Sequence, residues 1–168
     1  MVAHKLATLA YIVYNNEEVL LLFRNKKEDD FHEGKYIGIG GRLEPGETPL
    51  ECILRELEEE TGYSLLSQEV EFRGYIYFDE IHRDKITEDL PAFNWLVFLY
   101  YVHVSEKLNF ENPEGRLQWI PIKEIPYAKM WAGDRIFTPK LLETQEIVEA
   151  KFIYDGEEIV QWSFGRET

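Results

Sequence analysis

The sequence contains a single cysteine, Cys52, and no long apolar run. One cysteine cannot build an internal disulfide framework, and it excludes zinc sites made of several cysteines. A helix that spans a bilayer needs about 20 consecutive apolar residues, and no run in the sequence approaches that length. The opening residues, "MVAHKLATLAYIVY", have little of the basic segment of a secretion signal. We therefore expect a cytoplasmic protein without disulfides.

Basic residues are also scarce. The chain has 18 lysines and arginines against 32 aspartates and glutamates, which gives a net charge of −14. Non-specific affinity for nucleic acids comes mainly from basic side chains on phosphates, so this charge argues against a nucleic acid polymer or an anionic membrane as partner. A small polyphosphate would be repelled as well, unless divalent cations lay between it and the protein.

The sequence shows no internal repeat, low-complexity segment or linker. Its 168 residues suit one domain, 1–168, with a sizeable core. The 45% hydrophobic and 14% aromatic content is typical of a packed globule. Strands and helices mix without regular strand–helix–strand alternation. This order indicates an α/β protein with a central mixed β-sheet and helices packed against it.

Runs rich in β-branched and aromatic residues predict the strands. They lie on both sides of a turn at Asn15-Asn16, over 68–81 and 93–105, in a short strand and turn at 117–126, and in a hairpin over 151–164 that turns at Asp155-Gly156. The polar segments 26–36 and 82–92 read as loops. Residues 134–150 predict a helix that Pro139 interrupts or kinks.

The clearest local pattern predicts a helix from Pro49 to Gly62, after a glycine-rich loop at 37–47. Thr48 can cap this helix, Pro49 suits its first position, and Glu51 completes a capping box. Gly62 is typical of the residue that ends a helix. Apolar residues recur at helical spacing and should face a core; they are Leu50, Ile53, Leu54 and Leu57.

Three glutamates of this helix should lie close together. At about 100° per residue, Glu56, Glu59 and Glu60 project within a sector of about 100°, beside the apolar stripe. Such a cluster can simply be a solvated acidic face. Because carboxylates are ligands that suit Mg²⁺ or Mn²⁺, a metal site is the alternative, and metal ions would also let the acidic chain accept a polyphosphate.

The spacing resembles the Nudix box, Gx5Ex7REUxEExGU, in which U is a bulky aliphatic residue. Gly41, Glu47 and the run from Arg55 to Gly62 match every fixed letter, and Tyr63 departs from the pattern at its final U position. The resemblance implies a Nudix fold, an α/β/α sandwich around a mixed sheet. It also implies an enzyme that hydrolyses nucleoside diphosphate derivatives with a divalent metal and a water nucleophile.

The same resemblance implies roles for individual residues. Glu59 and Glu60 would be the main metal ligands, and Glu56 would share the metal or act as base. The Gly40 carbonyl would complete the metal site, and Glu114, before Trp119, would add a further ligand. Arg55 and Glu47 would pair and brace the loop against the helix. For Cys52 we expect a small buried side chain.

Shorter stretches, such as "GKYIGIGGR" and "KMWAGD", resemble the MutT-like 8-oxo-dGTP diphosphatase branch, which includes the animal oxidised purine nucleoside triphosphatases. In that branch a tryptophan stacks on the purine and an acid reads its edge, roles that would fall to Trp131 and Asp134. The structural alternatives are a core tryptophan and an aspartate that caps a helix beginning near Arg135.

Other positions of the branch pocket match less well. The resemblance places five more residues at the substrate: Thr8, Arg24, Phe31, Ile37 and Gly41. For Thr8, Arg24 and Phe31, strand and loop packing is the alternative. The animal enzymes have an asparagine where this chain has Ile37, and an acid where it has Gly133. Both differences remove polar groups that could read a base. His32, His82 and His103 show no metal-ligand spacing.

The sequence thus predicts a Mg²⁺-dependent hydrolase, with Mn²⁺ as a substitute, that cleaves a purine nucleoside triphosphate, best an oxidised one such as 8-oxo-dGTP, to the monophosphate and pyrophosphate. Its role would be sanitation of the nucleotide pool. Other nucleotides, such as ADP-ribose, dinucleotides or other triphosphates, stay open as substrates. A non-catalytic nucleotide sensor and an acidic protein-interaction domain are further alternatives. Both a monomer and a homodimer fit the sequence.

Overall fold

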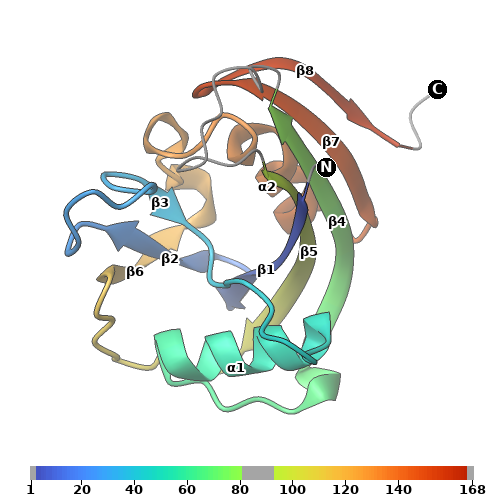
Figure 1. Ribbon diagram of the computed structural model, residues 1–168. Helices are drawn as coiled ribbons and strands as arrows, with labels where there is room; N and C mark the ends of the chain where they lie inside the picture. Colours follow the sequence, from blue (N-terminus) through green and yellow to red (C-terminus); the bar gives the residue numbers. More distant parts are fainter. Residues whose placement is uncertain (1–2, 81–92, 166–168) are drawn as a thin grey trace.

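The computed structural model describes residues 3–80 and 93–165 (Figure 1). The predicted loop at 82–92 lies outside these residues. Within them the chain forms one mixed β-sheet with a helix on each face. Neither helix is long and apolar enough to cross a membrane.

The sheet runs in the order β3-β2-β1-β5-β4-β7-β8, and β6 pairs with β2. Two pairs of neighbours, β1 with β5 and β4 with β7, are parallel, and the other pairs are antiparallel. The predicted mixed sheet is therefore confirmed. The strands are β1 Ala3–Tyr14, β2 Glu18–Arg24, β3 Tyr36–Ile37, β4 Val70–Glu80, β5 Phe93–Val104, β6 Gly115–Pro121, β7 Val148–Asp155 and β8 Glu158–Phe164.

Helices α1 (Pro49–Thr61) and α2 (Asp134–Glu143) cover opposite faces of the sheet. Side chains alternate along β1, so that Ala10 and Ile12 pack with α1 while Tyr11 and Val13 pack with α2. The molecule is thus an α/β/α sandwich, as predicted. Short 3₁₀ turns lie at Ser67–Glu69, Ile122–Glu124 and Tyr127–Lys129.

Helix α1 has the predicted caps. The Thr48 hydroxyl accepts the Glu51 backbone N–H at 3.2 Å, and the Glu51 carboxylate accepts the Thr48 N–H at 2.8 Å. Gly62 ends the helix with a φ of 78°, which glycine adopts without strain. The buried face of the helix includes Cys52, as expected, together with Ile53. The two ends of α1 and its buried face, and with them the positions of its glutamates along the helix, therefore follow from local sequence signals.

The prediction of a helix over 134–150 is wrong beyond Glu143. Helix α2 ends there, with Pro139 inside it, and Val148–Asp155 is strand β7. Parallel pairing with β4 draws residues 148–150 into the sheet. The buried guanidinium of Arg73 also donates to the Thr144 carbonyl at 2.6 Å and to the Glu146 carbonyl at 3.0 Å. These contacts hold the turn between α2 and β7.

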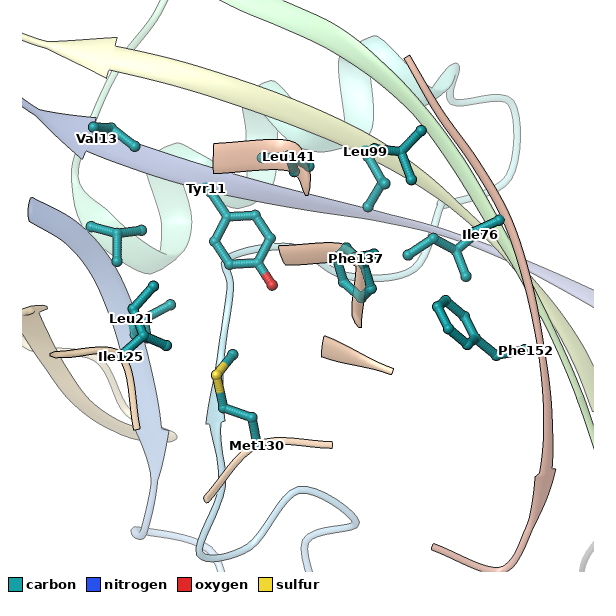
Figure 2. Close-up of a cluster of buried hydrophobic side chains, with 13 residues drawn as sticks. Tyr11, Val13, Leu21, Ile76, Leu99, Ile125, Met130, Phe137, Leu141 and Phe152 are labelled. Carbon is teal, nitrogen blue, oxygen red and sulfur yellow. The ribbon is translucent and has the colours of Figure 1, made fainter. Parts of the chain in front are cut away.

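The core between the sheet and α2 carries aromatic and aliphatic side chains from both (Figure 2). Phe137 of α2 lies edge-on to Tyr11 of β1, with ring centroids 6.3 Å apart. The Tyr11 hydroxyl is within 3.0 Å of the Thr138 hydroxyl, so a polar group reaches the first turns of α2 from the centre of the sheet. This contact positions the N-terminal end of α2, where two of the predicted site residues lie.

Candidate active site

The glycine-rich loop passes tightly between β1 and helix α1. A Cβ atom on Gly40 would lie 1.9 Å from the Thr8 carbonyl oxygen, and one on Gly41 would lie 2.3 Å from Oε1 of Glu56. The loop also pairs with β1, since the Thr8 N–H donates to the Gly41 carbonyl at 2.8 Å. Only glycine lets the backbone come this close to both the strand and the carboxylate.

Arg55 joins the loop to the helix. Its Nε and Nη2 donate to the two oxygens of Glu47 at 2.7 and 3.0 Å, a two-point ion pair. Its Nη1 donates to Glu56 at 2.8 Å and to the exposed Glu59 at 3.1 Å. Hydrogen bonds from Arg55 lower the pKa of Glu47 to about 2. The predicted pairing of Arg55 with Glu47 is therefore present in the structure.

The negative charge of Glu60 is only weakly stabilised by its surroundings. Its Oε2 accepts the Gly40 backbone N–H at 3.2 Å. Burial raises its pKa to about 8, and the charges of Glu56 and Glu114 add to the rise. Burial also raises the pKa of Glu56, and the charges of Glu59 and Glu114 add to that rise. Burial and neighbouring carboxylates therefore oppose the ionisation of Glu56 and Glu60.

Glu114 comes to the same region from the loop before β6. In the structure it pairs with Arg24 and with Lys27, the latter at 3.1 Å. Asn112 fixes this loop on the helix: its side-chain amide donates to the Glu60 carbonyl at 3.1 Å and its Oδ1 accepts the Glu114 N–H at 2.8 Å. Glu114 therefore stands beside the C-terminal turn of α1, although it is distant in sequence.

In the described part of the chain, no three acidic, histidine or cysteine side chains converge as a ready metal site. The glutamates bind Arg55, Arg24 and Lys27 instead. Their chemistry nevertheless fits a hard divalent cation, because all are oxygen ligands and the raised pKa values of Glu56 and Glu60 report burial and negative charge that is not fully compensated. To hold an ion, Glu56 and Glu59 would exchange Arg55 for it.

A second group of predicted residues surrounds Trp131. The Phe31 ring stacks on the indole, with centroids 4.8 Å apart and planes 19° apart, while 77% of Phe31 is exposed. The Lys35 ammonium stands over the indole ring, 4.4 Å from its centroid. The indole N–H donates to Nδ1 of His32 at 2.8 Å. Trp131 is thus a partly exposed platform held by the loop at 26–36, rather than a core residue.

Asp134 lies beside this platform and points inward. It is 9% exposed and is the first residue of α2, whose N-cap is Gly133, so it does not cap the helix. Burial raises the pKa of Asp134 to about 7, although hydrogen bonds from the Trp131 backbone and the Tyr11 hydroxyl counteract part of the rise. Asp134 is thus a buried carboxyl group that changes protonation near neutral pH.

A cavity of about 460 Å³ opens next to Trp131 and has Lys35, Arg135 and Ile159 on its walls. It lies between the start of α2 and the turn of the β7–β8 hairpin. Its volume is in the range typical of small-molecule sites. Glu157 and Glu158 also line the cavity, and Glu157 pairs with Lys35 at 3.7 Å, so its walls combine an aromatic face with groups of both charges.

The remaining predicted residues are Thr8, Ile37 and Arg24. Thr8 is buried, and its hydroxyl contacts the Cys52 thiol at 3.3 Å on the α1 side of the sheet. Ile37 packs with the core on the same side. Arg24 connects the two groups, because it binds Glu114 and also Asp30 at 2.6 Å in the loop that holds Trp131.

Sequence reasoning missed two residues of these groups. His32 has no ligand spacing, and its contact with Trp131 joins positions that are far apart in the chain. Asn112 lies in a polar loop before Glu114, and no sequence pattern predicts its hydrogen bond to the Glu60 carbonyl of α1. In both cases the contact depends on the folded sheet rather than on neighbouring residues.

Comparison with known proteins matches residues 3–141 to the NUDIX domain family model. The oxidized purine nucleoside triphosphate hydrolase of Danio rerio is 28% identical over 165 residues, which cover 95% of this chain and 93% of that protein. The crystal structure of the mutator MutT protein from Bacillus halodurans superimposes with a TM-score of 0.76 and 25% identity, over 98% of this chain and 99% of that one.

A more distant fold match is the bifunctional NMN adenylyltransferase/ADP ribose pyrophosphatase of Francisella tularensis, in complex with AMP and a Mn ion. Its TM-score is 0.60 at 21% identity, over 85% of this chain and 42% of that one. The family match spans most of the chain, which therefore belongs to the Nudix family. It is a Nudix hydrolase, one of a class of enzymes that act on small nucleotide substrates and generally use a divalent metal.

Proposed function

We propose that the protein hydrolyses a purine nucleoside triphosphate, best an oxidised one of the 8-oxo-dGTP kind, to the monophosphate and pyrophosphate. The observation that carries the proposal is the crowding of carboxylates beside the glycine-rich loop: burial and the charges of Glu56 and Glu114 raise the pKa of Glu60, and burial raises that of Glu56 with a contribution from Glu114. Two further features support it: the stacking platform at Trp131 and the likeness to oxidized purine nucleoside triphosphate hydrolases.

Mg²⁺, with Mn²⁺ as a substitute, is the proposed cofactor. The proposed ligands are Glu56, Glu59, Glu60, Glu114 and the Gly40 carbonyl. When bound, the metal would neutralise the phosphates and lower the pKa of a water nucleophile. Arg55 and Glu47 contribute by position, because their two-point pair fixes the loop against α1. A glutamate freed from Arg55 can then accept a proton from the attacking water.

The proposed base site is at Trp131. A purine would stack on the indole, an interaction of about 1–3 kcal/mol per base. Asp134, with a pKa of about 7, can offer a protonated or an ionised carboxyl group to the base edge. Ile37 and Gly133 have no polar side-chain atoms, so selection between purines would depend on few hydrogen bonds.

The proposal is tested by pyrophosphate release from a panel of nucleotides with Mg²⁺. The panel pairs 8-oxo-dGTP with dGTP and oxidised with canonical adenine nucleotides, and it includes ADP-ribose and a dinucleotide. We expect the highest kcat/KM for an oxidised purine triphosphate. A clear preference for ADP-ribose or a dinucleotide would contradict the proposed substrate, and no turnover of any nucleotide would contradict the proposed activity.

The variants E59Q and E60Q test the proposed ligands in the same assay. We expect kcat to fall by about two or more orders of magnitude in each, because a lost metal ligand removes much of the charge stabilisation of the reaction. The matched control is E58Q, which changes the net charge equally on an exposed residue of the same helix. Near-normal rates for E59Q or E60Q in folded protein would remove that residue from the site.

A further inference from the structure

Trp131 is held in place by a hydrogen bond as well as by packing. Its indole N–H donates to Nδ1 of His32 at 2.8 Å, and the two rings meet edge-on at 82°. The neighbouring Phe31 ring lies on the indole face, which shows that this face accepts a flat aromatic group. Because Phe31 is largely exposed, it can leave the indole at little cost in buried apolar surface. His32 then remains as the hydrogen-bond acceptor of the indole N–H, together with the Lys35 ammonium over the ring.

His32 has the protonation state that this contact needs. A ring nitrogen that accepts an N–H carries no proton, so the histidine proton must lie on Nε2. Burial lowers the pKa of His32, and the nearby charges of Arg24 and Lys35 lower it further, against the opposing effects of Asp30 and Glu114. The balance keeps the imidazole neutral, with Nδ1 available as an acceptor.

The backbone of His32 is anchored in turn. Its N–H donates to Oδ1 of Asp30 at 3.2 Å, and Oδ2 of the same carboxylate accepts Nε of Arg24 at 2.6 Å. Arg24 also pairs with Glu114, next to the end of α1. The backbone that carries the imidazole is therefore tied through Asp30 to Arg24, at the end of β2.

We propose that His32 is a positioning residue for nucleotide binding, which acts by accepting the Trp131 indole N–H and so holding the indole as a fixed stacking surface for the base. The inference rests on the proposed function, in which a purine stacks on Trp131. A fixed indole loses no rotational freedom when the base binds, so His32 contributes to affinity without touching the substrate. It should therefore affect KM rather than kcat.

The test measures kcat and KM for the best purine triphosphate in H32A, H32N, W131F and the double variant H32A/W131F. H32A should raise KM about three- to tenfold with kcat nearly unchanged, as expected for the loss of one hydrogen bond between neutral groups. H32N should restore KM, because an asparagine Oδ1 can replace Nδ1 as acceptor. In W131F, which has no indole N–H, the further change H32A should have no effect on KM.

The control is H103A, which removes an exposed histidine from β5 and should leave both constants unchanged. Melting temperatures separate altered binding from altered folding. Three results would each overturn the role of His32: an unchanged KM in H32A, a KM in H32N as high as in H32A, or independent effects of H32A and W131F on KM. If the wild type turns over the nucleotide, the proposed function stands in each of these cases. Absence of wild-type turnover would instead overturn the proposed function.

Discussion

Asp134 is a buried carboxyl group that forms no ion pair with any cation of the described residues. The cost of its burial to the stability of the folded protein can be measured. Its pKa rises from 3.8 to about 7 in the folded protein. The folded state therefore binds a proton more tightly than the unfolded chain does. As pH increases from about 4 to about 7, ionisation of this group increasingly favours the unfolded state, and above pH 7 the cost is constant.

The variant D134N avoids this cost because asparagine does not ionise. We expect the free energy of unfolding of D134N, relative to wild type, to increase between pH 4 and pH 7 by up to about 4 kcal/mol and then to level off. Urea unfolding of both proteins at pH 4, 5, 6, 7 and 8 measures the difference. A difference that does not change with pH would show that Asp134 keeps an ordinary pKa.

At the scale of single residues, the sequence was informative where function depends on spacing along one helix. Arg55 and Glu47 pair in the structure as their box positions predict, and Arg55 also donates to Glu56, a contact that was not predicted. His32 and Trp131 could not be paired in this way, because their contact depends on how β2, the following loop and the start of α2 come together. The sequence also did not show that Thr8 packs beside Cys52 whereas Trp131 lies beside His32.

At the scale of secondary structure, α1 was predictable because every signal for it is local: a capping box, a helical apolar stripe and a terminal glycine. Residues 144–150 were not. Their composition favours a helix, but pairing of β7 with β4 and the contacts of Arg73 come from distant parts of the chain. Tertiary contacts therefore decided the structure there against local preference.

Arg73 is a buried side chain that holds the α2–β7 turn through its guanidinium. It is 2% exposed, and its guanidinium donates to the Thr144 and Glu146 carbonyls. R73M keeps an apolar stem of similar length but leaves these carbonyls without their donor. We expect a loss of about 3 kcal/mol in the free energy of unfolding, measured by urea denaturation.

The matched control for R73M is R116M, on β6, because Arg116 is exposed. We expect it to change the free energy of unfolding by less than about 0.5 kcal/mol. Equal losses in the two variants would mean that the carbonyl contacts of Arg73 do not hold the turn.

At the scale of the whole molecule, the net charge of −14 and the glutamate cluster both oppose the binding of an anionic nucleotide. An anionic nucleotide approaching the end of α1 would meet Glu56, Glu60 and Glu114, where burial and neighbouring carboxylates raise the pKa values of Glu56 and Glu60. The α/β/α sandwich supplies a rigid loop, strand and helix around these groups. Divalent cations are the agents that would make this acidic surface accept an anionic nucleotide.

The most direct test of this account is calorimetric titration of wild-type protein, E58Q and E60Q with Mn²⁺ and with Mg²⁺, without nucleotide. The account predicts saturable binding of the metal to wild type and E58Q, and loss of that binding in E60Q. No saturable binding to the wild type, or equal binding in all three proteins, would contradict it.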